Sequence, residues 1–169
     1  MAKLPILLLP DPILRAAALP VERVDADLRR LVDDMLETMY AAPGIGLAAP
    51  QVGVSRRLLV MDPSSRDDNP EPMALINPEI LEFGDERQVG EEGCLSIPDI
   101  FADVERPASV LVRYLDEQGE PAERRFEGRP AVIIQHEVDH LNGVLFIDHL
   151  SKLRRDLLIR KFRKRAATS

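Results

Sequence analysis

The 169-residue sequence has only one cysteine, Cys94, and it contains no tryptophan. A single cysteine excludes an intrachain disulfide, the bond that stabilises many small exported domains. No apolar run is long enough to cross a bilayer. The apolar N-terminal stretch is interrupted by Pro5 and Pro10, and no small-residue cleavage site follows it. We therefore expect a cytoplasmic protein that has no membrane partner.

Nothing in the composition indicates disorder or several domains. Apolar residues make up 45% of the sequence and charged residues 30%, which is ordinary for a globular protein. The length suffices for one complete hydrophobic core, and no internal repeat, low-complexity segment or composition shift marks a domain boundary. We therefore expect residues 1–169 to form a single domain, and we expect that domain to be a monomer.

Charge is distributed unevenly along the sequence, whose net charge is −7. Residues 151–169 hold eight Lys or Arg and one Asp, whereas residues 1–150 hold 14 basic and 28 acidic side chains. Helical periodicity, with Ser151 as a cap, predicts a basic helix at about 151–166. Its apolar stripe is expected to pack on the body of the protein, while its basic face is a candidate contact for a polyanion. The stripe consists of Leu153, Leu157, Leu158 and Phe162.

The remaining periodicities predict an α+β domain. Apolar residues at three- and four-residue spacing predict a helix at 25–42, and a second helix is expected at 130–141. We expect short antiparallel or mixed strands around this second helix, with the first helix on the N-terminal side and the basic helix at the C-terminus. Between the two helices we expect first a glycine-rich segment at 44–53, a strand at 56–62 and a polar loop at 63–72. Two short strands within 73–84, which break at Asn77–Pro78, should follow. A hairpin at 108–128 should turn near Gln118–Gly119.

The helix at 130–141 carries the H-E-x-x-H pattern, within QHEVDHLNGVLF at residues 135–146. Each residue of an α-helix turns by about 100°, so His136 and His140 lie roughly 40° apart on one face and one turn apart along the axis. Both imidazoles can therefore reach one metal ion. Glu137 lies beside that face, within reach of a water at the ion, which is the position of a general base. The pattern predicts a metal-binding helix at the centre of the fold.

Two histidines leave a catalytic metal site incomplete, because such sites use three protein ligands and an open position. Metallopeptidases with this motif take the third ligand downstream, for example in H-E-x-x-H-x-x-G-x-x-H. Here Gly143 is present, but Phe146 occupies the last position, and no glutamate follows Glu137. Cys94, in EEGCLSIP at residues 91–98, is the remaining soft ligand, and Cys/His/His with water forms an open tetrahedral site. The alternative role for a lone cysteine is that of a small buried hydrophobe.

Three segments in this order resemble the motifs of bacterial peptide deformylases of the type-one branch: GIGLAAPQVG at 44–53, EEGCLSIP at 91–98 and QHEVDHLNGVLF at 135–146. The resemblance extends over most of the sequence and includes the helix at 25–42 and the C-terminal helix. It implies a metal-dependent hydrolase that removes the N-formyl group from the N-terminal formyl-methionine of newly made polypeptides and releases formate.

The resemblance also implies a role for each matching residue. Cys94, His136 and His140 would bind the metal, typically Fe²⁺, which Zn²⁺, Ni²⁺ or Co²⁺ can replace. Glu137 would act as general base and acid. The other implied groups are Gln51 and the backbone N–H of Leu95, which would hold the oxyanion, and backbone groups of Ile45, Gly46 and Gly93, which would pair with an extended substrate.

One position departs from the family pattern. Arg129, in GRPAVIIQHE at 128–137, replaces what is usually an apolar residue near the methionine pocket. Ile45, Val132 and Ile133 could still line that pocket, and Arg129 could extend its charged end outward. The substitution bears on side-chain preference and not on the metal site. The family further suggests docking near the ribosomal exit tunnel, for which the basic C-terminal helix is the candidate.

Two other functions remain open at this point. A small metallopeptidase would use the same helix to cleave internal peptide bonds, and the missing downstream ligand counts against it. A non-enzymatic protein would carry a structural metal and bind the ribosome through its basic helix, and the intact catalytic positions count against that.

Overall fold

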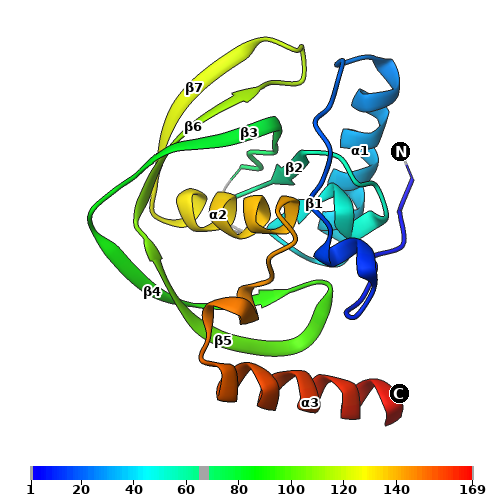
Figure 1. The fold of residues 1–169 in the computed structure, drawn as a ribbon. Helices are drawn as coiled ribbons and strands as arrows, with labels where there is room; N and C mark the ends of the chain where they lie inside the picture. Colours follow the sequence, from blue (N-terminus) through cyan, green and yellow to red (C-terminus); the bar gives the residue numbers. More distant parts are fainter. Residues whose placement is uncertain (1, 65–68, 169) are drawn as a thin grey trace.

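The computed structural model describes residues 2–64 and 69–168. Its α-helices are α1 at Ala26–Ala41, α2 at Arg129–Leu141 and α3 at Lys152–Thr168 (Figure 1). Short 3₁₀ turns are η1 at Pro12–Arg15, η2 at Ala49–Val52 and η3 at Phe146–His149.

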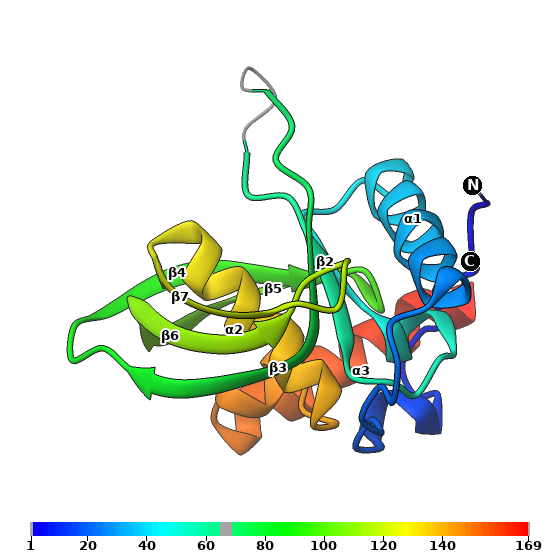
Figure 2. The ribbon, with the colours of Figure 1, turned by 90° about the horizontal axis from the view of Figure 1, so that it is seen from above.

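The helix predicted at 25–42 is confirmed as α1. It begins after Asp25, whose side chain accepts a hydrogen bond from the Leu28 N–H at 2.9 Å. This cap satisfies one of the amide groups that the first turn of a helix leaves without a partner. Its buried face packs against β1 and β2, and Figures 1 and 2 show these two strands between α1 and α2.

The strands form two antiparallel sheets, which confirms the α+β class. Five strands pair in the order β1-β2-β3-β6-β7, and β4 pairs with β5 in a separate two-stranded sheet. The strand predicted at 56–62 is β2, and the hairpin predicted at 108–128 is the β6–β7 pair. The polar loop predicted at 63–72 includes residues 65–68, which lie outside the described residues. The strand bounds are Gly46–Ala48 (β1), Leu58–Met61 (β2), Met73–Phe83 (β3), Arg87–Cys94 (β4), Ile97–Pro107 (β5), Ser109–Leu115 (β6) and Pro121–Glu127 (β7).

The prediction of two short strands within 73–84 is wrong, because β3 is a single strand. Its register with β6 shifts between Ile76 and Glu79, and Asn77 has a positive φ of 50°. Asparagine adopts this left-handed conformation more readily than most residues. Here both ends of the Asn77 amide hydrogen-bond to the backbone of Val21, at 2.8 and 2.9 Å. A bulge therefore stands where the sequence predicts a strand end.

The β4–β5 hairpin is the part of the fold that the sequence-based prediction missed. It follows β3 directly and lies between α2 and α3 (Figure 1). In β5, burial alternates between adjacent residues, so Ile100, Ala102, Val104 and Arg106 face the protein interior. Such period-two alternation is the mark of a strand with one buried face. The hairpin matters for function because β4 ends at Cys94.

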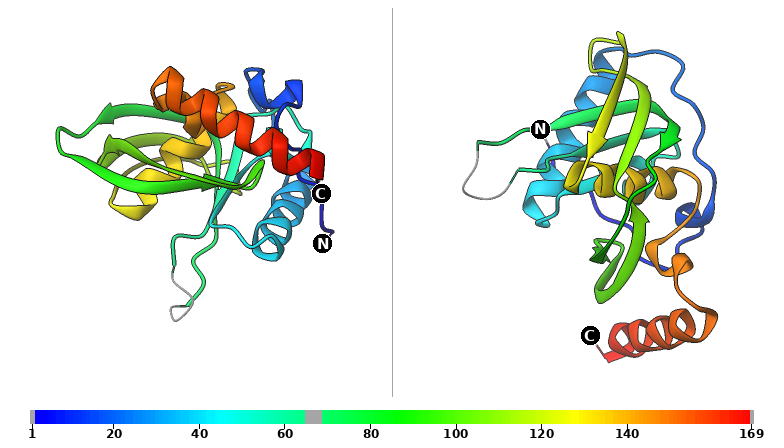
Figure 3. Two further views of the ribbon diagram at one scale, coloured as in Figure 1. Left: turned by 90° about the horizontal axis from the view of Figure 1, so that it is seen from below. Right: turned by 90° about the vertical axis from the view of Figure 1, so that its left-hand side faces the viewer.

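α2 is the central helix of the molecule, as predicted. It begins after Gly128, which has a positive φ of 66°, and Pro130 occupies its first turn. Proline is favoured there because its missing N–H would have no helical partner. The helix ends before Gly143, where an added Cβ would lie 2.5 Å from the Arg15 carbonyl oxygen. Nine of its 13 residues are buried, and it is surrounded by strands in both views of Figure 3. A helix buried on most sides is unusual for one that carries charged residues.

Three clusters of buried side chains hold these layers together. The first lies between α2 and the β3, β6 and β7 strands, the second joins α1 to β1 and β2, and the third joins β5 and η3 to α3. Representative fully buried members are Ile134 and Val112 in the first cluster, Met35 and Leu58 in the second, and Ile100 and Phe146 in the third.

α3 confirms the predicted basic helix, but its predicted apolar stripe packs only in part. Phe162 is buried and Leu158 is half-buried in the third cluster. Leu153 and Leu157 are 73% and 52% exposed, so their predicted packing is wrong. The helix packs mainly on β5 and η3, and this narrow contact leaves the flanking leucines in solvent. No helix within the described residues is both long and apolar enough to traverse a membrane.

Candidate metal centre

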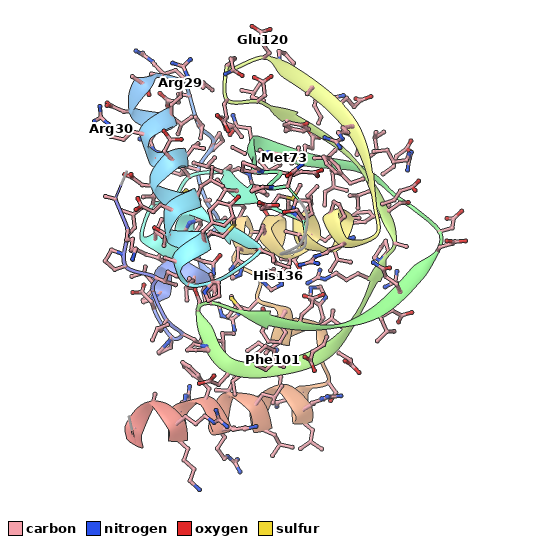
Figure 4. The ribbon with its side chains drawn as sticks, turned by 180° about the vertical axis from the view of Figure 1, so that it is seen from behind. Arg29, Arg30, Met73, Phe101, Glu120 and His136 are labelled. Carbon is pink, nitrogen blue, oxygen red and sulfur yellow. The ribbon has the colours of Figure 1, made fainter. Side chains whose placement is uncertain are left out.

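Three predicted ligand residues converge on one point of the fold. Ligand atoms from Cys94, His136 and His140 lie within 4.8 Å of one another. The histidines come from α2 and the cysteine from the end of β4, where the hairpin register shifts. Figure 4 labels His136 on α2, and it labels Phe101 on the hairpin between α2 and α3. A thiolate and two imidazoles suit a four-coordinate divalent ion that keeps one open position.

Glu92 orients the first of the two candidate histidine ligands. Its Oε1 lies 2.9 Å from His136 Nδ1. Burial alone would raise the pKa of Glu92, but hydrogen bonds from His136 and Arg106 lower this pKa to about 2. The ionised carboxylate can only accept, so His136 donates through Nδ1 and its Nε2 lone pair is left for a metal. A carboxylate behind a ligating histidine is the usual way in which proteins fix the ring of such a ligand.

The second histidine ligand is buried as well. His140 is 1% exposed, and its Nε2 lies 3.3 Å from Cys94 Sγ. Burial lowers the pKa of His140 well below its usual range, which favours the neutral imidazole that binds metals. Its Nδ1 is a buried atom to which the described residues offer no hydrogen-bond partner.

The surroundings of His136 favour a positive charge at this centre. Burial opposes the charged imidazolium, but Glu137, Cys94 and Glu92 together raise the pKa of His136 well above its usual range. Positive charge is therefore favoured at this position. A divalent cation would supply the same positive charge, so the electrostatics of the residues present fit a bound metal.

Gln51 is held with its amide nitrogen toward the cysteine. The side chain is 2% exposed, and its Oε1 accepts a hydrogen bond from the Ala48 N–H at 2.9 Å. Its Nε2 donates to Ser96 Oγ at 3.1 Å and lies 3.5 Å from Cys94 Sγ. The Ser96 N–H also points at this sulfur, at 3.4 Å. The fixed amide can present an N–H to an anionic ligand.

Glu137 lies beside the ligands without belonging to them. It is 4% exposed, and its Oε1 has no hydrogen-bond partner among the described residues. Burial raises the pKa of Glu137 to about 7, although the charge of His136 acts in the opposite direction. A carboxyl group with a pKa near neutrality can both accept and return a proton. Gly46 makes room for it, since an added Cβ there would lie 2.6 Å from Glu137 Oε2.

These groups border a pocket of about 620 Å³. All predicted substrate-contacting residues line it, as do Gln51, Leu95, Cys94, His136 and Glu137. The predicted substrate-contacting residues are Ile45, Gly46, Gly93, Val132 and Ile133. The pocket also includes Phe101, whose ring would be 2.6 Å from a Cβ added at Gly93.

Two side chains that bear on the predictions lie elsewhere. Arg129, expected near the methionine pocket, is exposed at the start of α2 and is absent from the described pocket lining. Phe146, which stands where an extended peptidase motif needs histidine, is 1% exposed. Its ring stacks on His136 with centroids 6.0 Å apart. Phe146 therefore packs against a candidate metal ligand and cannot supply one itself.

Sequence reasoning missed the buried groups behind the ligands. Arg106 clamps Glu92 through two hydrogen bonds of 2.6 and 2.9 Å, and its Nη1 reaches Asp139 at 3.0 Å. The alternation Ile100, Ala102, Val104, Arg106 places an arginine where an apolar residue is expected. A buried arginine needs a carboxylate partner. That pattern could have revealed the ion pair had the strand been recognised.

Comparisons of sequence agree with this geometry. A family model described as polypeptide deformylase matches residues 3–156. The peptide deformylase of Mesorhizobium japonicum is 62% identical over 162 residues, which cover 96% of this chain and 92% of that protein. The peptide deformylase of Rhizobium meliloti is 57% identical over 164 residues, which cover 97% of this chain and 94% of that protein.

Solved structures resemble the whole molecule. The crystal structure of peptide deformylase from Ehrlichia chaffeensis in complex with actinonin has a TM-score of 0.92 and 43% identity, and the match covers 98% of each chain. The peptide deformylase from Legionella pneumophila has a TM-score of 0.90 and 46% identity, with 99% of this chain and 97% of that chain covered.

Proposed function

We propose that Cys94, His136 and His140 bind the metal ion on which the activity of this chain depends. The chain belongs to the polypeptide deformylase family, and it removes the N-formyl group from newly made polypeptides. The observation that carries the proposal is the convergence of three ligand atoms within 4.8 Å of one another, beside a pocket lined by Cys94, His136 and Glu137. Glu137 Oε1 has no hydrogen-bond partner within residues 2–64 and 69–168, which supports a role toward bound water or substrate.

Glu137 is proposed as the general base and acid. When bound, a divalent cation would polarise the formyl group and lower the pKa of water. Glu137 takes a proton from the attacking water as its oxygen adds to the formyl carbon. The carbon–nitrogen bond then breaks, and Glu137 returns the proton to the amine nitrogen. The formic acid released in this way then gives up its proton, which the free amine takes up. The products are therefore formate and an ammonium amino terminus, so atoms and charge balance.

Gln51 and the backbone N–H of Leu95 are proposed to stabilise negative charge on the formyl oxygen. The support for Gln51 is its fixed amide, held by Ala48 on one side and by Ser96 on the other. A donor that needs no reorganisation at the moment of reaction contributes about 3 kcal/mol to such a transition state.

The extended substrate is proposed to lie along β1 and the end of β4. β1 is an edge strand of its sheet, and both Gly46 and Gly93 leave backbone groups accessible at the pocket. An extended peptide can add to such an edge through main-chain hydrogen bonds. Ile45, Val132 and Ile133 would contact the methionine side chain, which has matching apolar character.

Fe²⁺ is proposed as the native metal, with Zn²⁺, Ni²⁺ or Co²⁺ able to replace it. A Cys/His/His set accepts all four ions, and relative affinity alone does not select among them. Iron bound by a thiolate is sensitive to oxidation. Activity that declines in air and persists in anaerobic preparations containing iron would support this proposal. Protein that is purified anaerobically from its native cells and contains zinc in place of iron would contradict it.

The remaining proposals concern the cellular setting. We infer a cytoplasmic monomer that receives its substrate from the ribosome, with α3 as the ribosome contact. Absence from the cytoplasmic fraction would contradict the location. Light scattering in solution tests the monomer, and a mass twice that of one chain would contradict it.

Removing the thiolate tests the metal site. Cys94→Ala should lose most of its metal, whereas wild type and Val89→Ala should each hold about one ion per molecule. Val89 is a suitable control because it lies on the same strand and is 66% exposed. Elemental analysis of anaerobically purified samples measures the content. Full metal content in Cys94→Ala would refute the assigned ligand set.

A further inference from the structure

A hydrogen-bonded network joins the metal ligand His136 to the protein surface. Glu92 accepts from His136, and Arg106 clamps Glu92 with two of its nitrogens. Arg106 Nη1 also donates to Asp139 Oδ2 at 3.0 Å. The same oxygen lies 2.7 Å from the Nε2 of His149. These five side chains are called the His136–His149 network below.

The direction of each bond in the network follows from the chemistry of its members. The carboxylates of Glu92 and Asp139 accept, and arginine only donates. His149 must therefore donate to Asp139 through Nε2. Donors and acceptors then alternate along the network without a conflict, so each group restricts the rotation of the next.

Burial decreases outward along the network. The side chains of Arg106 and Glu92 are 4% and 7% exposed, that of Asp139 is 23% exposed, and that of His149 is 38% exposed. The outer end borders a second cavity, of about 430 Å³, which includes Arg106, Asp139 and His149 in its lining. His149 is thus the one network member supplied by η3, and it closes the network from outside.

We propose that His149 is a positioning residue for the metal centre, acting through Asp139, Arg106 and Glu92 on His136. The inference rests on the metal ligands proposed above. Its physical basis is that Asp139 Oδ2 has two donors that hold the carboxylate in one rotamer. Asp139 in turn shares the Arg106 guanidinium with Glu92, and it immediately precedes the ligand His140 in α2.

His149 also links two elements, η3 and α2. η3 follows α2 after a short loop, so the His149–Asp139 bond ties the segment beyond the helix back to the helix face. Without the Nε2 donor, Asp139 can rotate toward solvent and take Arg106 with it. Glu92 then loses part of its clamp, and the imidazole of His136 gains freedom that weakens its hold on a metal.

The test uses the full-length protein loaded with Co²⁺, whose visible absorption reports ligand geometry. His149→Leu removes the donor and keeps an apolar side chain of similar size, while His149→Gln can place an amide N–H where Nε2 lies. Transfer of Co²⁺ to an excess of chelator gives the rate of metal release. We expect release to become about threefold to tenfold faster in His149→Leu and to stay near the wild-type rate in His149→Gln.

Two further variants set the scale of the effect. Glu92→Gln changes a direct partner of the ligand, so release should be about 10- to 100-fold faster. Glu82→Gln weakens the exposed Arg125–Glu82 contact of 3.0 Å, which lies on the β3–β6–β7 sheet and outside the network, and should leave release unchanged. The Co²⁺ absorption band should shift in His149→Leu and match wild type in Glu82→Gln.

The outcomes separate positioning from a structural contact. If His149→Leu lowers the unfolding temperature of the metal-free protein but leaves Co²⁺ release and absorption unchanged, the contact is only structural and the proposal is overturned. Unchanged behaviour in every assay also overturns it. If Cys94→Ala retains Co²⁺ as well as wild type does, the proposed ligand set itself is wrong, and this inference fails with it.

Discussion

At the scale of single residues, the centre depends on close approaches that only certain side chains permit. Gly46 is the sharpest example, because its missing Cβ leaves space for Glu137 Oε2 and for Ile133 Cγ2, which would lie 2.6 and 2.9 Å away. Such distances are shorter than van der Waals contact. Both neighbours are buried on α2, so neither can move freely.

Gly46→Ala should therefore displace Glu137 without removing a metal ligand. We expect turnover to fall by about 10- to 100-fold because a base misplaced by about 1 Å transfers a proton less effectively. Metal content should match wild type. Gly90→Ala is the matched control, since no atom of the part of the chain that the structure describes lies within 4 Å of a Cβ added there. Equal loss of turnover in both variants would argue against a specific contact with Glu137.

Residue types and spacings sufficed to propose metal ligands and a base, but they did not reveal the groups that hold these residues. The H-E-x-x-H spacing has a geometric meaning on any helix, so His136, Glu137 and His140 can be recognised locally. Glu92 and Arg106 are 14 positions apart in the sequence, and they meet in an ion pair between β4 and β5. No local pattern states which carboxylate an inward-facing arginine will meet. The supporting groups therefore became visible only with the fold.

At the scale of elements, α1, α2 and α3 were predictable because capping residues and 3.6-residue periodicity mark helices locally. The β4–β5 hairpin was not recognised, since its glutamates and glycines near the turn obscure the alternation. β3 was divided in the prediction because Asn77–Pro78 is a frequent strand end. Its bulge depends on Val21, which lies far away in the sequence.

The end of β2 offers a prediction about an element and the loop that follows it. Asp62 is 5% exposed and accepts hydrogen bonds from the Tyr40 hydroxyl at 2.6 Å and from the Ser64 and Glu71 N–H groups. Burial opposes the charge of Asp62, but these hydrogen bonds and that of the Ser64 hydroxyl lower its pKa below the usual value of 3.8. Its ionised form is thus more favourable in the folded protein than in the unfolded one.

This shift sets the pH dependence of one part of the stability. Because the pKa of Asp62 is lower in the folded state, its contribution is present above about pH 4 and declines as the pH falls through the folded value. Asp62→Asn should reduce the free energy of unfolding by about 1–2 kcal/mol at pH 7. The difference from wild type should shrink below pH 4.

Chemical denaturation at several pH values measures this difference. Asp33→Asn changes an exposed aspartate on α1 and should follow wild type throughout. A gap between wild type and Asp62→Asn that stays constant down to pH 3 would mean that ionisation of Asp62 does not stabilise the fold.

At the scale of the whole molecule, charge is separated between an acidic body and α3. Arg154, Arg160 and Arg163 are exposed on α3, whereas Arg165 pairs with Asp99 of β5 at 3.7 Å. Phe162, which packs α3 on the body, is therefore not among the side chains that would contact a polyanion. Variants of the basic face can therefore change binding without disturbing the fold.

Replacing Arg154, Arg160 and Arg163 by glutamate should weaken binding to ribosomes. Each lost phosphate contact removes about 0.7 to 0.9 from the slope of log affinity against log salt, so the slope should fall by about 2 or more. Co-sedimentation with ribosomes over a salt series measures it. Release of formate from a free peptide should remain at the wild-type rate.

The matched control applies the same change of charge to another face. Arg113, Arg124 and Arg125 lie on the β6–β7 hairpin, and their replacement by glutamate alters net charge equally. This second variant should retain most of the ribosome binding. Equal loss in both variants would mean that net charge, and not α3, governs the interaction.

The central claim is that a metal held by Cys94, His136 and His140 works together with Glu137 as the proton-transferring group. The most direct measurement is the rate of formate release from a formyl-methionyl peptide by wild type and Glu137→Ala, with the metal content of the same anaerobic samples. We predict equal metal content and a rate at least about 100-fold lower in Glu137→Ala. A Glu137→Ala protein that releases formate at the wild-type rate would contradict the account.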